Sequence, residues 1–136
     1  MTKLTSFEFE GQHFSTKFEE TQTVKAGVEC DIYSFIDNKS MDLAIVRVER
    51  GYKTPLQRIR QGNKTVEGFV SGKGVLTVQV GGESKTYSFD DSNIDQPVVV
   101  GIGQIVQWEA DHDVDLVFSE VCDPPYVDGR FEDLPE

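Results

Sequence analysis

Residues 51–74 read Gly-Tyr-Lys-Thr-Pro-Leu-Gln-Arg-Ile-Arg-Gln-Gly-Asn-Lys-Thr-Val-Glu-Gly-Phe-Val-Ser-Gly-Lys-Gly, and this stretch is the strongest indication of the fold. It holds two short segments, 53–60 and 64–71, that we expect to be β-strands. Gln61-Gly62-Asn63 separates the two segments, and a Val-Ser-Gly-Lys-Gly turn follows the second one. A strand–turn–strand unit of this kind is typical of antiparallel β-proteins.

The rest of the chain continues the same pattern, with turn signals about every ten residues. Gly81-Gly82 predicts a two-residue hairpin turn of the primed kind, because glycine adopts positive φ without steric cost. No long window shows a helical apolar period, so we expect little helix. The expected strands are 28–36, 41–50, 53–60, 64–71, 74–80, 84–89, 97–100, 105–109 and 114–121.

Length, charge and cysteine content limit the class of protein. At 136 residues the chain is expected to be one domain, and its net charge of −11 argues against nucleic acid and anionic membranes as partners. No apolar run is long enough to span a membrane and no signal peptide is visible, so we expect a cytoplasmic protein. Cys30 and Cys122 are interpreted as buried free thiols.

Three regions are expected within this single domain. Phe and Glu alternate over part of residues 1–23. This alternation predicts an extended N-terminal arm that packs onto the barrel or onto a partner in a homodimer. Residues 24–122 would form the barrel. Residues 123–136 are acidic and are expected to be an irregular tail laid across the surface.

The stretch 51–74 resembles the first motif of the cupin family, which reads close to Gly-x-x-Thr-Pro-Leu-His-x-His, a Glu, and Val-Leu-x-Gly-x-Gly. Gln57 and Ile59 stand where the two histidines would be. Residues 100–110 resemble the second motif, with Val106 at the histidine position and Ala110 at the asparagine position. The resemblance covers residues 41–126. It implies an all-β fold, an antiparallel double-stranded β-helix (the jelly-roll or cupin barrel), for a single domain over residues 1–136.

The departures from these motifs bear on metal binding. A catalytic transition metal needs about three protein donors, usually imidazoles and a carboxylate. Ile59 and Val106 offer only hydrocarbon, and the Gln57 amide is a weak ligand. Thr65 or, with a longer spacer, Glu67 takes the glutamate position. We therefore expect no metal site and no cofactor.

The resemblance implies a pocket whose lining contains a few polar groups among apolar ones. Trp108 is either a stacking platform for a ligand or a core residue. Glu67 is either a general acid or base whose pKa is raised by burial, or a structural partner of Arg58, Arg60 or Lys64. The expected lining is Gln57, Ile59, Thr65, Glu67, Phe69, Val106 and Trp108.

Charge is unevenly spread, with basic residues gathered between positions 47 and 64 and acidic residues after position 109. These groups either pair with one another or leave a basic mouth for a phosphorylated or carboxylated ligand. The basic residues are Arg47, Arg50, Lys53, Arg58, Arg60 and Lys64.

Three functions follow as hypotheses. The first is a metal-free cupin barrel that binds a small polar molecule, with a sugar or sugar nucleotide as candidate ligand and Gln57, Glu67 and Trp108 as contacts. The second is a metal-independent isomerase or epimerase with Glu67 as acid or base. The third is a structural or interaction protein whose barrel is plugged by its own side chains. Fold alone does not decide among them.

Overall fold

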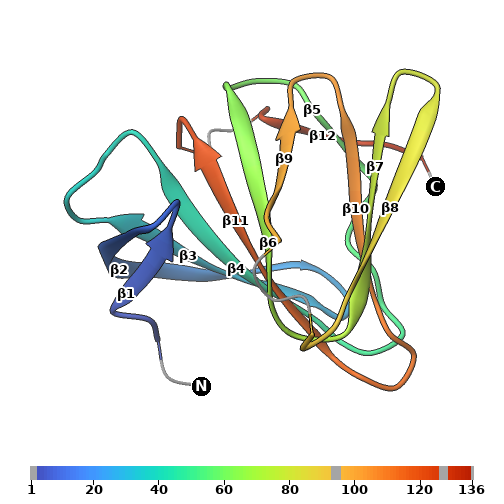
Figure 1. Ribbon diagram of the computed structural model, residues 1–136, viewed down its shortest axis with the longest axis horizontal. Coiled ribbons are helices and arrows are strands. Elements are labelled where there is room, and N and C mark those ends of the chain that lie inside the picture. The colour runs from blue at the N-terminus through green and yellow to red at the C-terminus, as the bar shows by residue number, and fades with distance from the viewer. Residues whose placement is uncertain (1–2, 93–95, 126–128, 136) are drawn as a thin grey trace.

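The computed structural model describes residues 3–92, 96–125 and 129–135. Within these ranges the chain forms strands and no helix, and thus no helix that could cross a membrane. Two antiparallel sheets face each other, in the orders β1-β2-β3-β4-β11-β6-β9 and β12-β5-β10-β7-β8 (Figure 1). The strands are β1 (Ser6–Phe9), β2 (Gln12–Lys25), β3 (Val28–Phe35), β4 (Asp42–Val48), β5 (Gln57–Ile59), β6 (Lys64–Gly72), β7 (Gly74–Val80), β8 (Glu83–Phe89), β9 (Val98–Gly101), β10 (Ile105–Ala110), β11 (Leu116–Asp123) and β12 (Phe131–Asp133).

The all-β prediction is confirmed, and most expected strands agree with the observed ones to within two residues. The strand expected over residues 53–60 is wrong, because only β5 forms there. Pro55 has no N–H to donate to a ladder, which interrupts pairing at this point. Before it, Thr54 donates its N–H to the carbonyl of Trp108 at 2.9 Å and accepts the Trp108 N–H on its hydroxyl at 3.0 Å.

Two glycines explain turns that the sequence predicts. Gly72 ends β6 with a φ of +89°, and a Cβ there would lie 1.8 Å from the carbonyl oxygen of Asp115. Only glycine fits this close approach between β6 and the segment that enters β11. Gly81 has a φ of +63° and starts the turn between β7 and β8, where Val80 pairs with Glu83. The predicted hairpin is therefore confirmed.

Alternation along the strands of the larger sheet separates two cores. Tyr33, Leu43, Val121 and Val66 follow one another in register across β3, β4, β11 and β6 and belong to the outer core. The residues between them point to the opposite face, toward the smaller sheet. A second core, which includes Trp108, fills the space between the sheets.

The N-terminal arm was expected to be extended. It forms instead a hairpin within the same chain. β1 pairs with β2, and β2 continues the sheet by pairing with β3 (Figure 1). Asp31 anchors the hairpin from the outer face of β3. It accepts hydrogen bonds from Lys3 at 3.2 Å, Thr21 at 2.6 Å and Arg47 at 2.7 Å. A role for this arm in a homodimer stays a prediction.

The C-terminal segment is not irregular throughout, which corrects the expected tail. β12 adds a strand to the smaller sheet by pairing with β5. Arg130, just before β12, is 1% exposed and donates to the carbonyls of Lys64 at 2.6 Å, Pro124 at 2.9 Å and Asp123 at 3.5 Å. Gly62 leaves room for its guanidinium, since a Cβ there would lie 2.1 Å from Nη1. The C-terminal segment is thus held on the barrel by the pairing of β12 with β5 and by the buried Arg130 side chain.

We predict that Arg130→Ala destabilises the protein by about 3 kcal/mol, because buried carbonyls lose charge-assisted hydrogen bonds. Urea denaturation measures the change. Arg50→Ala is the control, since the Arg50 side chain is 66% exposed and forms an ion pair with Asp115, whose side chain is 60% exposed. Its removal should cost about 0.5 kcal/mol. Equal effects of the two substitutions would contradict this account of Arg130.

Candidate functional site

Two glutamates lie opposite each other on the inner face of the larger sheet. Ile32, Ala44, Glu120 and Glu67 follow one another in register across β3, β4, β11 and β6. Directly paired residues on adjacent antiparallel strands place their side chains side by side on the same face. The register of β11 and β6 therefore brings the two carboxyl groups together. Glu67 is fully buried, and Glu120 is partly buried.

Trp108 reaches the carboxyl pair from the opposite sheet. Its indole N–H donates to Oε1 of Glu67 at 2.8 Å. The indole also stacks on the Phe118 ring of β11, with 4.5 Å between centroids and 11° between planes. Because Thr54 is hydrogen-bonded to the main chain of Trp108, the Thr-Pro-Leu segment holds this strand in place. Trp108 thus belongs to the core and also reaches the polar site.

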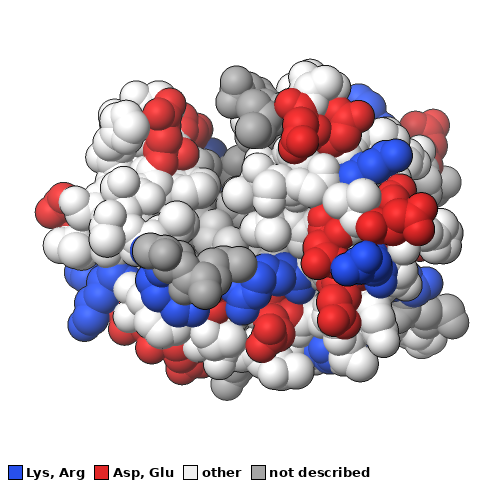
Figure 2. Space-filling view, turned by 90° about the horizontal axis from the view of Figure 1, so that it is seen from below, with Lys and Arg blue, Asp and Glu red and all other residues white. Residues whose placement is uncertain are grey.

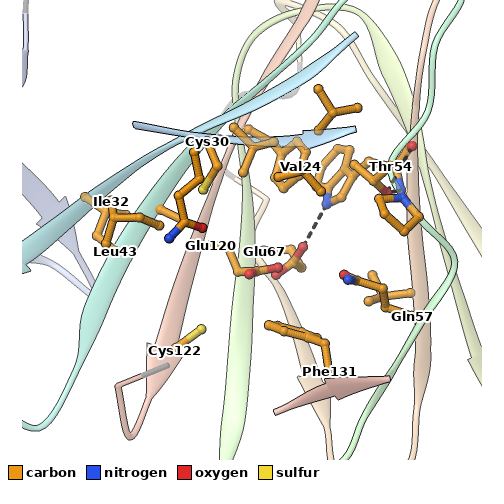
Figure 3. Close-up of a pocket in the computed structure, with 18 of the residues that line it drawn as sticks. Val24, Cys30, Ile32, Leu43, Thr54, Gln57, Glu67, Glu120, Cys122 and Phe131 are labelled. Carbon is orange, nitrogen blue, oxygen red and sulfur yellow. Dashed lines mark hydrogen bonds between the residues drawn. The ribbon is translucent and has the colours of Figure 1, made fainter. Parts of the chain in front are cut away.

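A cavity of about 330 Å³ adjoins this arrangement, between the sheets. Figure 3 shows the carboxyl groups of Glu67 and Glu120 close together, with Gln57 and Phe131 across from them. The remaining lining is aliphatic, aromatic, proline and cysteine, with no Lys or Arg among the described residues. The polar and acidic lining residues are Gln22, Asp42, Thr54, Gln57, Glu67 and Glu120.

Four of the residues expected at the site line this cavity, and three do not. Gln57, Glu67, Val106 and Trp108 are at its wall, and Gln57 pairs in register with Val106. Two of the three positions where the cupin motifs have histidines are thus neighbours. The other three are buried in the protein interior away from the wall: Ile59, Thr65 and Phe69. A contact between any of these seven residues and a ligand stays a prediction.

Four residues of the cavity wall were not among the expected site residues: Asp42, Phe118, Glu120 and Phe131. One signal was present for Glu120. Alternation in 114–121 places it on the same face as Leu116 and Phe118, and a carboxylate on an apolar strand face is unusual. Asp42 and Phe131 carried no such signal, because their positions depend on which strands become neighbours.

The surroundings of the pair favour its protonated form. Burial raises the pKa of Glu67 well above its usual range, and the nearby charge of Glu120 raises it further, whereas the Trp108 hydrogen bond opposes the shift. Burial also raises the pKa of Glu120, although a hydrogen bond from Glu67 and the charge of Arg130 act against this. With both groups ionised, Oε2 of Glu67 is buried without a hydrogen-bond partner. A proton on that oxygen supplies the missing bond, since it donates to Glu120.

Both cysteines are free and buried, as predicted. Burial, followed by the charge of Glu120, raises the pKa of Cys30 to about 12. The same two causes raise the pKa of Cys122 above its usual range. Both side chains are therefore neutral thiols in the cavity wall and weak nucleophiles.

Of the two interpretations of the basic segment, pairing with acidic residues is the better supported. Arg58 and Arg60 contact Glu132 at 3.5 Å and 2.9 Å, and Arg50 contacts Asp115 at 3.6 Å. On the face shown in Figure 2, Lys and Arg side chains lie next to Asp and Glu side chains. No basic residue among those described lines the cavity, so a basic mouth is not supported.

The residues present do not fit the metal centre that cupin motifs usually build. Among the described residues, no group of three His, Cys, Asp or Glu side chains is arranged to hold a metal ion. Ile59 and Val106 supply no donor atoms, and Glu67 is hydrogen-bonded to Trp108. We derive no chemistry through a metal at this site.

An all-antiparallel pair of facing sheets in this strand order, with a site between them, is the double-stranded β-helix of the cupin fold. Solved structures of oxalate decarboxylase share the fold. One covers 85% of this chain at a TM-score of 0.70 and 23% identity. Another, from Bacillus subtilis at pH 4.6, covers 83% at 0.68 and 23% identity. A third, concerned with the Mn(II) centres of the Bacillus subtilis enzyme, covers 79% at 0.66 and 24% identity.

The match to those structures extends over only 28–30% of their length. No family model and no curated protein matches the sequence. The likeness therefore establishes the cupin fold of this chain. It leaves the function to be argued from the site.

We predict that Glu67→Gln changes how stability depends on pH. An acid whose pKa is raised by folding keeps its proton in the folded state, so stability falls as pH rises from about 4.5 through the raised value. Glutamine can accept from Trp108 and donate to Glu120 at every pH. The variant should therefore melt near wild type at low pH and above it at high pH.

Thermal melts between about pH 4 and about pH 9 measure this difference. Glu83→Gln, on exposed β8, removes a charge without touching the cavity and is the control. A Glu67→Gln curve parallel to that of wild type would show that Glu67 does not hold a proton in the folded state.

Proposed function

We propose that this cupin-fold barrel binds a small molecule in the cavity beside Glu67 and Trp108, without a metal ion. One observation carries the proposal. Oε2 of Glu67 is fully buried, lacks a hydrogen-bond partner when both carboxyl groups of the pair are ionised, and belongs to a residue that lines the cavity. A buried polar atom left unsatisfied costs about 1–3 kcal/mol, which a ligand or a shared proton offsets.

The size and composition of the cavity support the same proposal. Its volume of about 330 Å³ lies at the small end of the range typical of ligand sites. Mostly apolar walls with a few convergent polar groups are also typical of such sites. The aromatic surface of Trp108 and Phe118 offers a flat wall, while Gln57 and the glutamate pair offer hydrogen bonds.

The charge of the lining argues against one class of candidate ligand. A sugar nucleotide carries phosphates, and an anion in this cavity would meet Asp42, Glu67 and Glu120 with no Lys or Arg among the described lining residues. Like charges in a partly desolvated site repel strongly. The proposed ligand is therefore a molecule of the size of a monosaccharide or smaller, without net negative charge.

A second function is favoured by a separate observation, the raised pKa of Glu67. A carboxyl group whose pKa is raised well above its usual range, beside a second carboxyl group, can act as a general acid or base. Metal-independent isomerisation with Glu67 in this role is the alternative proposal. A plugged barrel is less well supported, because space remains beside Trp108 and Phe118.

We predict that some members of a panel of small neutral and cationic compounds raise the melting temperature, whereas anionic compounds do not. A ligand at about 100 times its Kd stabilises the folded state by about 2.7 kcal/mol. The same compounds should change the emission of Trp108, the only tryptophan. Glu83→Gln should leave both signals intact. A broad panel without a single hit would refute the binding proposal.

A further inference from the structure

The cavity gathers carboxyl groups. Asp42, Glu67 and Glu120 all line it, from three neighbouring strands of one sheet, and no described lining residue is Lys or Arg. Arg130 is the basic group that acts on Glu120, but its guanidinium donates to main-chain carbonyls and does not line the cavity. Burying the carboxyl group of Glu67 beside that of Glu120 is costly, so the pair favours a positive charge inside the cavity.

The walls around these groups are aromatic. Trp108 and Phe118 stack on each other at 4.5 Å, and both line the cavity. Phe131, on β12, lies across from the glutamate pair in Figure 3. The faces of aromatic rings attract organic cations, and the attraction is stronger where water is excluded. The carboxyl groups and the aromatic rings therefore both favour a cationic ligand.

The second oxygen of Glu67 locates the charge. Oε1 of Glu67 accepts the indole N–H of Trp108, whereas Oε2 is buried beside Glu120 and has a partner only when the two carboxyl groups share a proton. A single proton between the two carboxyl groups leaves one net negative charge on the pair. An ammonium group placed there would neutralise that charge.

We infer that the ligand is a small organic cation, an amine or a quaternary ammonium compound, whose charged nitrogen lies at the Glu67–Glu120 pair. Its alkyl groups pack against Trp108, Phe118 and Phe131. This inference rests on the proposed function, since it names the ligand class of the same cavity. An organic cation fits better than a metal ion because the described residues provide no three-donor group. The chain's net charge of −11 also raises the local concentration of cations.

The affinity for such a cation should depend on pH. The titratable groups that act on the pair are Asp42 on β4, Cys30 on β3, Cys122 on β11 and the buried Arg130. The thiols stay neutral because their pKa values are raised. Cation affinity should therefore rise with pH as the glutamate pair loses protons, and it should be lowest when both carboxyl groups are protonated.

The test compares choline with its neutral isostere, in which a carbon atom replaces the ammonium nitrogen, alongside simple alkylammonium ions. Titration calorimetry and Trp108 fluorescence measure each Kd on the full chain. We expect the cation to bind at least about tenfold more tightly than its isostere at pH near 8, and this ratio to shrink toward one near pH 4. The isostere controls for size and apolar contact, so the ratio reports the charge alone.

Glu120→Gln and Glu67→Gln each remove one carboxyl group with little change in volume, and both should reduce the cation-to-isostere ratio. Glu83→Gln should leave it unchanged. Melting curves establish that each variant is folded before its binding is measured. This inference would be overturned if the isostere and the cation bound equally, or if neutral members of the panel bound while every cation failed. The proposed function would still stand in both cases. Failure of every compound would overturn both.

Discussion

The register between β6 and β11 is the constraint on which the site depends. It places Glu67 directly opposite Glu120, and a one-residue slip of either strand would turn the carboxyl group of that strand to the outer face. That outer face is occupied by a separate apolar core, which includes Val66 and Val121. The same packing that fixes the sheet therefore fixes the carboxyl pair inside the barrel. The cost of burying the pair is met by the Trp108 hydrogen bond and by a retained proton.

Closure of the barrel depends on a different buried charge. Arg130 binds three main-chain carbonyls and directs the chain into β12, which pairs with β5. β12 in turn supplies Phe131 to the cavity wall. The C-terminal segment therefore belongs to the site as well as to the fold, although its composition alone suggests a solvated tail. Glu132, which follows Phe131, pairs with Arg58 and Arg60 and removes these basic groups from any role at the cavity.

The local sequence predicts those parts of the structure that local chemistry determines. Turn glycines and the alternation of β7 were sufficient to place that strand and its hairpin. The strand predicted over residues 53–60 was too long because the prediction did not allow for Pro55, which has no N–H to donate to a ladder. Glu120 and Asp42 were missed for another reason. Their meeting with Glu67 depends on which strands become neighbours, and long-range pairing leaves little trace in a single sequence. The resemblance to cupin motifs left Thr65 and Glu67 as alternatives for the glutamate position, and only the structure supplied the partners of Glu67.

The histidine positions of the cupin motifs and the proposed charge of the ligand are linked through Glu67. In the motif that this chain resembles, a glutamate shares its site with histidines and a metal cation, and that cation compensates the carboxylate. Gln57 and Val106 are paired in register at these positions, and neither can hold such an ion. Glu67 nevertheless remains fully buried, so its negative charge still needs compensation. A proton shared with Glu120 provides part of this compensation. An ammonium group beside the pair would provide the rest, which is why we propose a cationic ligand, over a neutral sugar, for a cavity whose described residues form no group that could hold a metal ion.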